Sequence, residues 1–251
     1  MSSAAISFIV LALVFGGALA GLLLRRSLPQ EHISPDSKDT VKLSMALVST
    51  MSALVLGLLV SSAKTFYDTQ SSELNQMSAD VVALDRLLAH YGPETKEARE
   101  ELRVAVIRNL DGIWPQERTR ASEEPVSDKP GESLLDEIQA LSPKDDKQRA
   151  LGAQALNLAV STGRIRWLMY EQSNASFSRT FLVVMVFWLF LVFFSFGLFA
   201  PRNVIAIASL FAAALAVSGA IFLILEMYSP FTGLIQISSA PLRSALAHLG
   251  R

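Results

Sequence analysis

The chain has 251 residues, of which 51% are hydrophobic and 18% charged, and its formal net charge at pH 7 is −1. Soluble domains usually carry about 25% charged residues, so this deficit indicates a membrane protein, and the near-zero net charge gives no indication of nucleic-acid binding. The chain has no cysteine, which excludes disulfides, thiolate metal sites and thiol catalysis.

Four apolar stretches each have the length of about 20 residues that a helix needs to cross a bilayer. They cover residues 5–24, 43–63, 180–200 and 203–226, and charged residues occur only at their ends. We therefore expect an all-α integral membrane protein with four transmembrane helices and a helical extramembrane domain between spans two and three. The predicted domains are a first transmembrane pair (1–63), a stalk domain (64–179), a second transmembrane hairpin (180–226) and an interfacial C-terminal tail (227–251).

The first span is expected to be an uncleaved anchor rather than a signal peptide. No basic residue precedes it, whereas Arg25 and Arg26 follow it, which is the reverse of the signal-peptide pattern. Gly17 and Gly21 on this span form a weak pattern of small residues four apart, which allows helices to approach closely within a membrane.

The second span is predicted to continue beyond the membrane as a long helix, because neither glycine nor proline occurs from Leu58 to Tyr91. Gly92 and Pro93 then end it. Apolar side chains in this extension are three or four residues apart and form a heptad seam, which packs either on helices of the same chain or on another subunit. The seam residues are Leu74, Met77, Val81, Leu84, Leu88 and Tyr91.

The rest of the stalk domain also has helical patterns. A helix is expected after Pro93, a short one from Ser133 to Leu141, and a long one beginning at Ser142 and Pro143, which suit the N-cap and first-turn positions. Span four carries a stripe of small residues, which favours close helix packing in lipid. Its members are Ala206, Ser209, Ala213, Ala216 and Ala220.

Basic residues near the spans give a weak indication of orientation, since cytoplasmic loops are usually richer in lysine and arginine. The loops after spans one and three contain more of them than the two terminal tails. This distribution favours termini and a stalk domain on the side opposite the cytoplasm.

Three short strings resemble a bacterial family of four-span proteins, the bestrophin-like domain family, long catalogued as a domain of unknown function. They are Arg25-Arg26-Ser27-Leu28-Pro29 after span one, Leu56-Gly57-Leu58-Leu59 in span two, and Leu225 to Gly233, which contains Pro230-Phe231-Thr232-Gly233. The resemblance implies a multi-pass protein of the bacterial inner membrane. Bestrophins are pentameric anion channels with a helical cytosolic region, so the resemblance also implies the opposite orientation of the stalk domain.

Span two is the candidate pore helix, because hydroxyl-bearing and small residues in a span line water or bond to other helices. The alternative is that they pack against the small residues of span four. The candidate pore-lining residues are Ser49, Ser52, Ala53, Gly57 and Ser61.

A second candidate site is a charge cluster at one membrane edge, formed by Lys64, Arg179 and Glu226. It would act as an ion-pair anchor or as a gate charge, or Glu226 would simply extend to the interface. His32, His90 and His248 are too dispersed for metal binding, and no catalytic or phosphate-binding motif occurs, so we expect no cofactor, no metal and no enzyme activity.

Two functions remain open. The first is an oligomeric bestrophin-like channel that passes small ions, anions by the resemblance, with span two lining the pore of a homo-oligomer in the lipid bilayer. The alternative is a non-conducting membrane scaffold or sensor whose stalk helices bind a partner.

Overall fold

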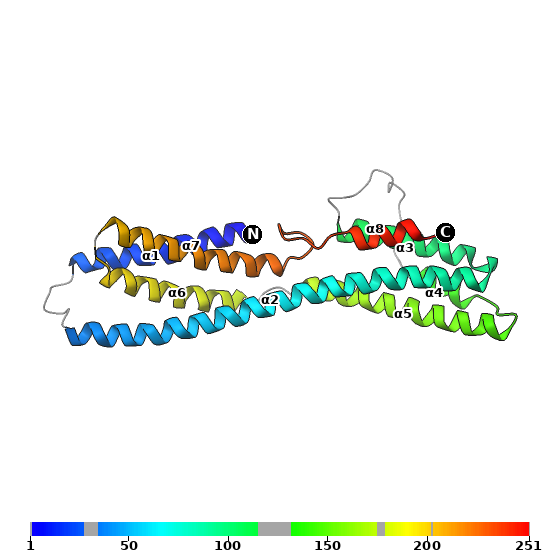
Figure 1. Ribbon diagram of the computed structural model, residues 1–251, viewed down its shortest axis with the longest axis horizontal. Coiled ribbons are helices and arrows are strands. Elements are labelled where there is room, and N and C mark those ends of the chain that lie inside the picture. Colours follow the sequence, from blue (N-terminus) through cyan, green and yellow to red (C-terminus); the bar gives the residue numbers. More distant parts are fainter. Residues whose placement is uncertain (1, 28–34, 115–131, 175–178, 202, 251) are drawn as a thin grey trace. The chain divides into compact units, whose positions relative to one another are not determined.

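The computed structural model describes residues 2–27, 35–114, 132–174, 179–201 and 203–250. These residues form α-helices joined by short connections, with no strand among them (Figure 1). The helices are α1 (Ser3–Ser27), α2 (Pro35–Tyr91), α3 (Lys96–Ile113), α4 (Glu132–Gln139), α5 (Asp146–Asn174), α6 (Arg179–Phe199), α7 (Val204–Met227) and α8 (Ala240–His248), with a short 3-10 helix, η2 (Pro93–Thr95), before α3.

The predicted all-α membrane fold is confirmed. Within the described part of the chain, four helices are long and apolar enough to cross a bilayer, and they cover Ser3–Arg25, Asp39–Tyr91, Thr180–Phe199 and Val204–Met227. The second is longer than a bilayer requires, because α2 continues without a break to Tyr91, as the absence of glycine and proline predicted.

The chain divides into two compact units. Unit 1 consists of Met1–Tyr67 and Ser176–Ser229, and unit 2 consists of Asp68–Ala175 and Pro230–Arg251. The C-terminal tail is therefore part of the same unit as the stalk helices. Its predicted position at the bilayer surface stays a prediction.

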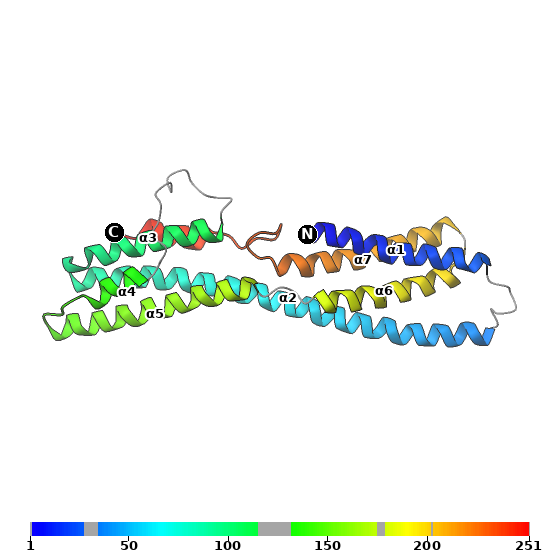
Figure 2. The ribbon, with the colours of Figure 1, turned by 180° about the vertical axis from the view of Figure 1, so that it is seen from behind.

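In unit 1, α1 packs closely on α6 and also on α7, and the three helices run side by side (Figures 1 and 2). Gly21 is essential to this packing, because a Cβ atom there would lie 2.1 Å from the backbone oxygen of Phe194. Gly17 faces the ring of Phe190 in the same interface. The weak glycine pattern in the first span thus marks the tightest helix pair of the unit.

The core of unit 1 lies between α1, α6 and α7, and its buried residues are Val10, Val14, Ala18, Met185, Leu189, Phe193, Ala214, Ile221 and Leu225. A buried hydrogen bond adds to this packing, since the Ser218 hydroxyl of α7 donates to the backbone oxygen of Ser7 at 2.6 Å. Ala214 and Ser218, rather than the predicted alanine stripe, form the inward face of α7. In that stripe Ser209, Ala213 and Ala216 are exposed.

In unit 2, the heptad seam of α2 is filled by helices of the same chain. Leu74, Met77, Leu84 and Leu88 are completely buried, and Val81 and Tyr91 nearly so. The interpretation of the seam as packing within one chain is therefore confirmed, and the alternative of a seam between subunits is wrong. The physical reason is that α3 and α5 also have apolar faces that must be removed from water, and they bury these faces against the seam. Leu102 and Val106 of α3 and Ala155 of α5 are buried.

Gly92 ends α2 as predicted. Its φ of 138° lies in a region that side chains other than glycine rarely adopt, and Pro93 begins the next turn. The long helix of the stalk starts three residues later than predicted, at Asp146. Its N-cap is Asp145, whose carboxylate accepts a hydrogen bond from the Gln148 backbone N–H at 2.6 Å.

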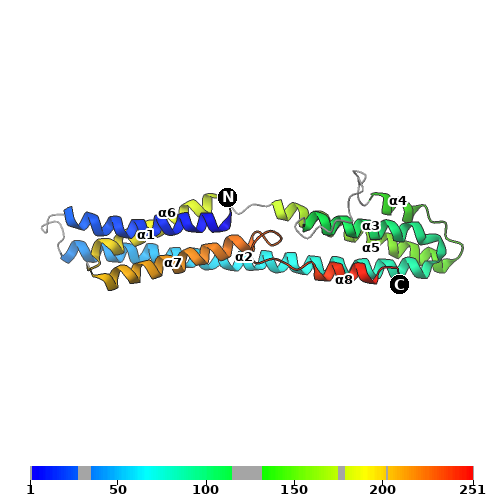
Figure 3. The same cartoon turned by 90° about the horizontal axis from the view of Figure 1, so that it is seen from above.

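The tail of unit 2 follows α3 and the last part of α2 (Figure 3). Leu242, Ala245 and Leu249 are buried, so α8 contributes an apolar face to the unit rather than lying free. The buried Trp114 at the end of α3 fixes the segment before α8, because its indole N–H donates to the backbone oxygen of Ile237 at 3.1 Å.

Candidate functional site

The part of α2 in unit 1 is covered on one side only. In an apolar stretch of 18 consecutive residues of this span, 6% of the residues are buried, compared with 39% in the corresponding stretch of α1. The covered side includes Ser52, which is 4% exposed, and Ala63, which is completely buried. The remaining surface of the helix therefore faces lipid or another molecule.

The structure separates the five candidate pore-lining residues. Ala53, Gly57 and Ser61 are exposed, whereas Ser52 is buried and Ser49 is half-buried. The Ser52 hydroxyl donates to the backbone oxygen of Val48 at 2.8 Å, which satisfies it within its own helix. Ser52 therefore belongs to the packed side of α2.

The exposed candidates belong to a longer row that sequence reasoning missed. Its members are three or four residues apart and hence share one face of the helix. All of them are exposed, and all are small or carry a hydroxyl: Ala46, Thr50, Ala53, Gly57 and Ser61. We call this row the small-residue stripe. The sequence could have revealed this row. Without Ser49 and Ser52, the predicted residues are four apart, and steps of three and four residues toward the N-terminus lead to Thr50 and Ala46.

A second exposed row with the same spacing runs beside the small-residue stripe and contains only bulky apolar residues. Its members are Leu43, Leu47, Met51, Leu54 and Leu58. Bulky aliphatic side chains suit contact with lipid tails, whereas small residues favour close approach of helices or access of water. The two exposed rows of α2 therefore differ in what they can contact.

Lysines mark both ends of the small-residue stripe. Lys42 and Lys64 are exposed, and no acidic residue lies between them. The nearest carboxylates, Asp39 and Asp68, lie three and four residues farther out. The Lys42 ammonium is 3.4 Å from a carboxylate oxygen of Asp39, and the Lys64 ammonium lies 5.9 Å from the centre of the Tyr67 ring.

The predicted membrane-edge cluster is described only in part. Glu226 is 4% exposed in the last turn of α7, and Lys64 is exposed on α2. Arg179 begins α6, but its side chain lies outside the described residues. The meeting of these three charges stays a prediction.

Another contact joins α7 to α2 at this edge, and sequence reasoning did not find it. The Tyr228 ring stacks on Phe66 with 5.2 Å between ring centres, and its hydroxyl lies 3.1 Å from that of Ser62. Aromatic residues at a span end are a general signal for such contacts, but they do not identify the partner.

The residues of the family-like strings have structural roles where they are described. The Arg25 guanidinium donates to the backbone oxygen of Ala200, which neutralises the end of α6. Phe231 packs edge-on against Trp114, with ring centres 5.6 Å apart at 87°. Pro230 is buried, and its backbone oxygen accepts a hydrogen bond from the Ile237 N–H at 2.8 Å. The side chain of Arg26 and all of Pro29 lie outside the described residues, and Gly233 is half-buried.

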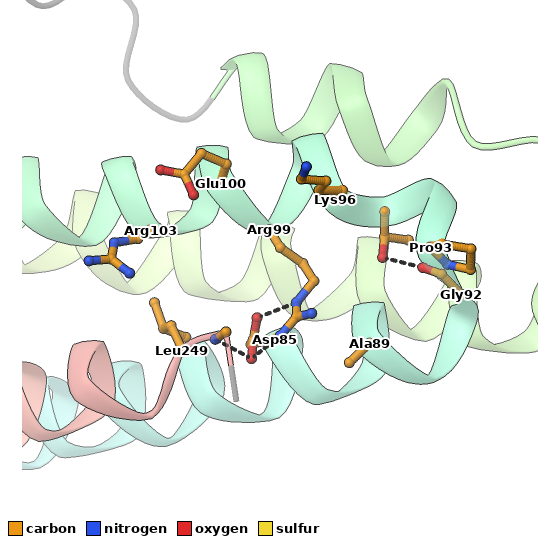
Figure 4. Close-up of a pocket in the computed structure, with 11 residues that line it drawn as sticks. Asp85, Ala89, Gly92, Pro93, Lys96, Arg99, Glu100, Arg103 and Leu249 are labelled. Carbon is orange, nitrogen blue, oxygen red and sulfur yellow. Dashed lines mark hydrogen bonds and ion pairs between the residues drawn. The ribbon is translucent and has the colours of Figure 1, made fainter.

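Unit 2 contains a pocket of about 430 Å³ beside α3, and charged residues of α2 and α3 are among those that line it. Arg99 reaches from α3 to Asp85 on α2, with Nε and Nη2 donating to the two carboxylate oxygens at 2.7 and 3.0 Å, whereas Lys96 and Glu100 point away from this pair (Figure 4). The hydrogen bond to Asp85 raises the pKa of Arg99 above its already high value. The backbone N–H of Gly250 also donates to Asp85, so this carboxylate links α2, α3 and the tail.

A surface ion pair between Glu94 and Lys144 joins η2 to the segment before α5. The hydrogen bond from Lys144 lowers the pKa of Glu94, and the same bond raises the pKa of Lys144. No group of three histidine, aspartate or glutamate side chains that could hold a metal ion occurs in the part of the chain that the structure describes.

The comparison with known families agrees with the fold. A family profile described as the bestrophin-like domain matches residues 12–242, which is most of the chain. No curated protein and no solved structure matches this chain. The family match and the four apolar helices make this a multi-pass membrane protein in contact with the lipid bilayer. The chain belongs to the bestrophin-like family.

Proposed function

We propose that this protein is an oligomeric channel for small anions, in which the small-residue stripe of α2 from each copy lines the pore. The proposal places it in a bacterial inner membrane. The observation that carries it is the exposed stripe on a transmembrane helix that its own chain leaves largely uncovered.

The shape of the stripe supports a role other than lipid contact. No heavy atom from outside its own helix lies within 4 Å of where a Cβ atom of Gly57 would be, so nothing in the chain requires a glycine there. A narrow pore between copies of α2 would require small residues on this face. The bulky row beside it supplies the lipid contact instead.

The charges near the stripe support anions over cations. Lys42 and Lys64 are the charged residues closest to the apolar segment at either end, and repetition of the chain around an axis would turn each into a ring of positive charge. Rings of lysine or arginine favour anions in pores, whereas rings of aspartate or glutamate favour cations.

The alternative function, a scaffold that binds a partner through the stalk seam, loses the feature that suggested it. The seam residues of α2 are buried within unit 2 of their own chain. A partner would have to displace α3 or α5 to reach them.

Cysteine accessibility in a flux assay tests the proposal, and the absence of native cysteine removes any background. Single variants Ala53→Cys, Gly57→Cys and Ser61→Cys are reconstituted in liposomes and treated with a charged, membrane-impermeant thiol reagent. We expect labelling and block of chloride flux at these positions. Leu54→Cys and Leu58→Cys are the matched controls, because they lie on the bulky row and should remain unlabelled.

Two results would contradict the proposal. One is the absence of chloride flux from liposomes that contain folded, oligomeric protein. The other is equal labelling of Leu54→Cys and Gly57→Cys, because in a channel the reagent would reach Gly57→Cys through the pore while lipid would shield Leu54→Cys. Lys64→Gln tests ion selectivity separately and is expected to reduce the preference for chloride over sodium.

A further inference from the structure

A groove in unit 1 shares Ala46 and Thr50 with the small-residue stripe and Lys42 with its flank, but the proposed function needs no ligand there. It has a volume of about 700 Å³, within the range of roughly 300–1,000 Å³ typical of ligand sites. It lies between the first turns of the α2 span, the end of α6 and the start of α7. Lys42 and Ser49 of α2, Ser195 and Phe196 of α6, and Ser209 and Leu210 of α7 are among its lining residues.

The polar groups of the groove are unevenly satisfied. The hydroxyls of Thr50 and Ser209 donate to backbone oxygens of their own helices, at Ala46 and Ile205. Ser195 is 5% exposed and lines the groove, yet among the described residues its hydroxyl has no hydrogen-bond partner. Because this hydroxyl opens onto the groove and is not held by another group there, it can donate to an acceptor oxygen of a ligand.

The groove carries positive charge at its mouth. Lys42 lines it, and its pair with Asp39 is an exposed contact of 3.4 Å with both side chains more than half exposed. Such pairs contribute little stability, so a stronger anion can replace the carboxylate. Arg25 binds the backbone oxygen of Ala200, another lining residue, which brings a second cation to the same end.

The positions of these groups along the helices match the order of the phosphate, ester and acyl groups in a phospholipid. Lys42 lies at the end of the α2 span, where a phosphate would be. Ser195 is four residues from the end of α6, or roughly 6 Å deeper along the helix, where the ester carbonyls of a glycerolipid follow the phosphate. Phe196 and Leu210 supply apolar surface for an acyl chain.

From these observations we propose that the groove binds one anionic glycerophospholipid, with its phosphate at Lys42, an ester carbonyl at Ser195 and an acyl chain between α2 and α6–α7. Basic pockets between transmembrane helices bind anionic lipid headgroups in this way. The proposal does not require conduction, because the groove exists within a single chain. Since Lys42, Ala46 and Thr50 belong both to the groove and to the proposed pore surface, in a channel the bound lipid would lie beside the pore at that end.

Lipid retention tests the proposal on the full chain. The protein in mild detergent is incubated with mixed micelles of phosphatidylglycerol and phosphatidylcholine that have identical acyl chains, repurified, and its retained lipids are counted by mass spectrometry. We expect about one phosphatidylglycerol per chain. Lys42→Gln should reduce the preference for phosphatidylglycerol about fivefold, the effect of one cation near a membrane surface. Lys64→Gln, at the other end of the span, should leave it unchanged.

A second pair of variants tests the Ser195 hydroxyl. Ser195→Ala should lower retention of phosphatidylglycerol by about fivefold, the effect of one hydrogen bond of ordinary strength. Ser209→Ala is the matched control, since that hydroxyl already bonds within its own helix. Both changes are small, so the folded state is expected to persist, and circular dichroism confirms it.

Several results would overturn the proposal. They are equal retention of the two lipids by the wild type, equal effects of Lys42→Gln and Lys64→Gln, and equal effects of Ser195→Ala and Ser209→Ala. Release of the lipid by excess inorganic phosphate would instead assign the mouth to soluble anions and would also overturn it.

Discussion

Gly197 of α6 lies directly against the backbone oxygen of Ala18 in α1, so closely that a Cβ atom at Gly197 would be 1.9 Å from that oxygen. Both groups belong to helix backbones, which cannot rotate away as a side chain can. The closeness of α1 and α6 therefore depends on the absence of a side chain at this position.

Gly197→Ala is accordingly expected to destabilise unit 1. The added methyl group forces the two helices apart, and overpacking of this kind costs about 1–3 kcal/mol. The measurement is the thermal unfolding midpoint in detergent. Gly219→Ala is the control, because no atom from outside its own helix lies within 4 Å of a Cβ atom there. Equal midpoints for the two variants would contradict the packing described.

Trp114→Phe is expected to loosen the tail of unit 2. The change keeps an aromatic ring against Phe231 but removes the indole N–H, which leaves the backbone oxygen of Ile237 without its donor. An unsatisfied buried group costs about 1–3 kcal/mol. Limited proteolysis measures this, as faster cleavage near Ile237.

The control for this experiment is Trp167→Phe, since Trp167 is 62% exposed on α5. Its cleavage rate should equal that of the wild type. If the protease also cleaves Trp114→Phe at the wild-type rate, the hydrogen bond to Ile237 does not hold the tail.

Asp85→Asn is expected to destabilise unit 2 by about 3 kcal/mol, the lower end of the cost of breaking a buried ion pair. The Asp85 side chain is 5% exposed and the Arg99 side chain 26%, so the cation that remains keeps some access to water. Chemical denaturation monitored by circular dichroism gives the free energy of unfolding.

The double variant Asp85→Asn/Arg99→Gln should be more stable than Asp85→Asn alone, because it leaves no unpaired charge. Asp146→Asn, which breaks the exposed pair with Arg149, should change the stability little. A double variant no more stable than Asp85→Asn would show that the loss comes from the Gly250 bond or from packing.

Hydropathy and helix-breaking residues predicted the elements well. The four spans, the continuous α2 and its end at Gly92 all followed from residue types along the chain. The heptad seam was also predictable, because in water an apolar stripe must be covered and the polar residues around it define its edges.

The faces of the transmembrane helices were harder to predict. Span residues are apolar all round, so hydropathy does not distinguish a packed side from a lipid-facing side. The alanine stripe of α7 is largely exposed, whereas Ala214 and Ser218 pack inward. In the same way, Ser52 of α2 is buried while Ala53 and Gly57 are exposed, although hydropathy gave no sign of this difference. Only the fit of individual side chains decides such cases, and the lysine-flanked stripe of α2 became evident once exposure was known.

The pairing of α1 with α6 also has a consequence for biosynthesis. About 150 residues separate the end of α1 from the start of α6, and at about 5–20 residues per second a ribosome needs roughly 8–30 s to make them. During that interval the glycine-bearing face of α1 lacks its partner helix, and α2 is the other membrane-spanning helix that has been made. Synthesis of α6 and then α7 completes the core, by which time α3, α4 and α5 have already left the ribosome.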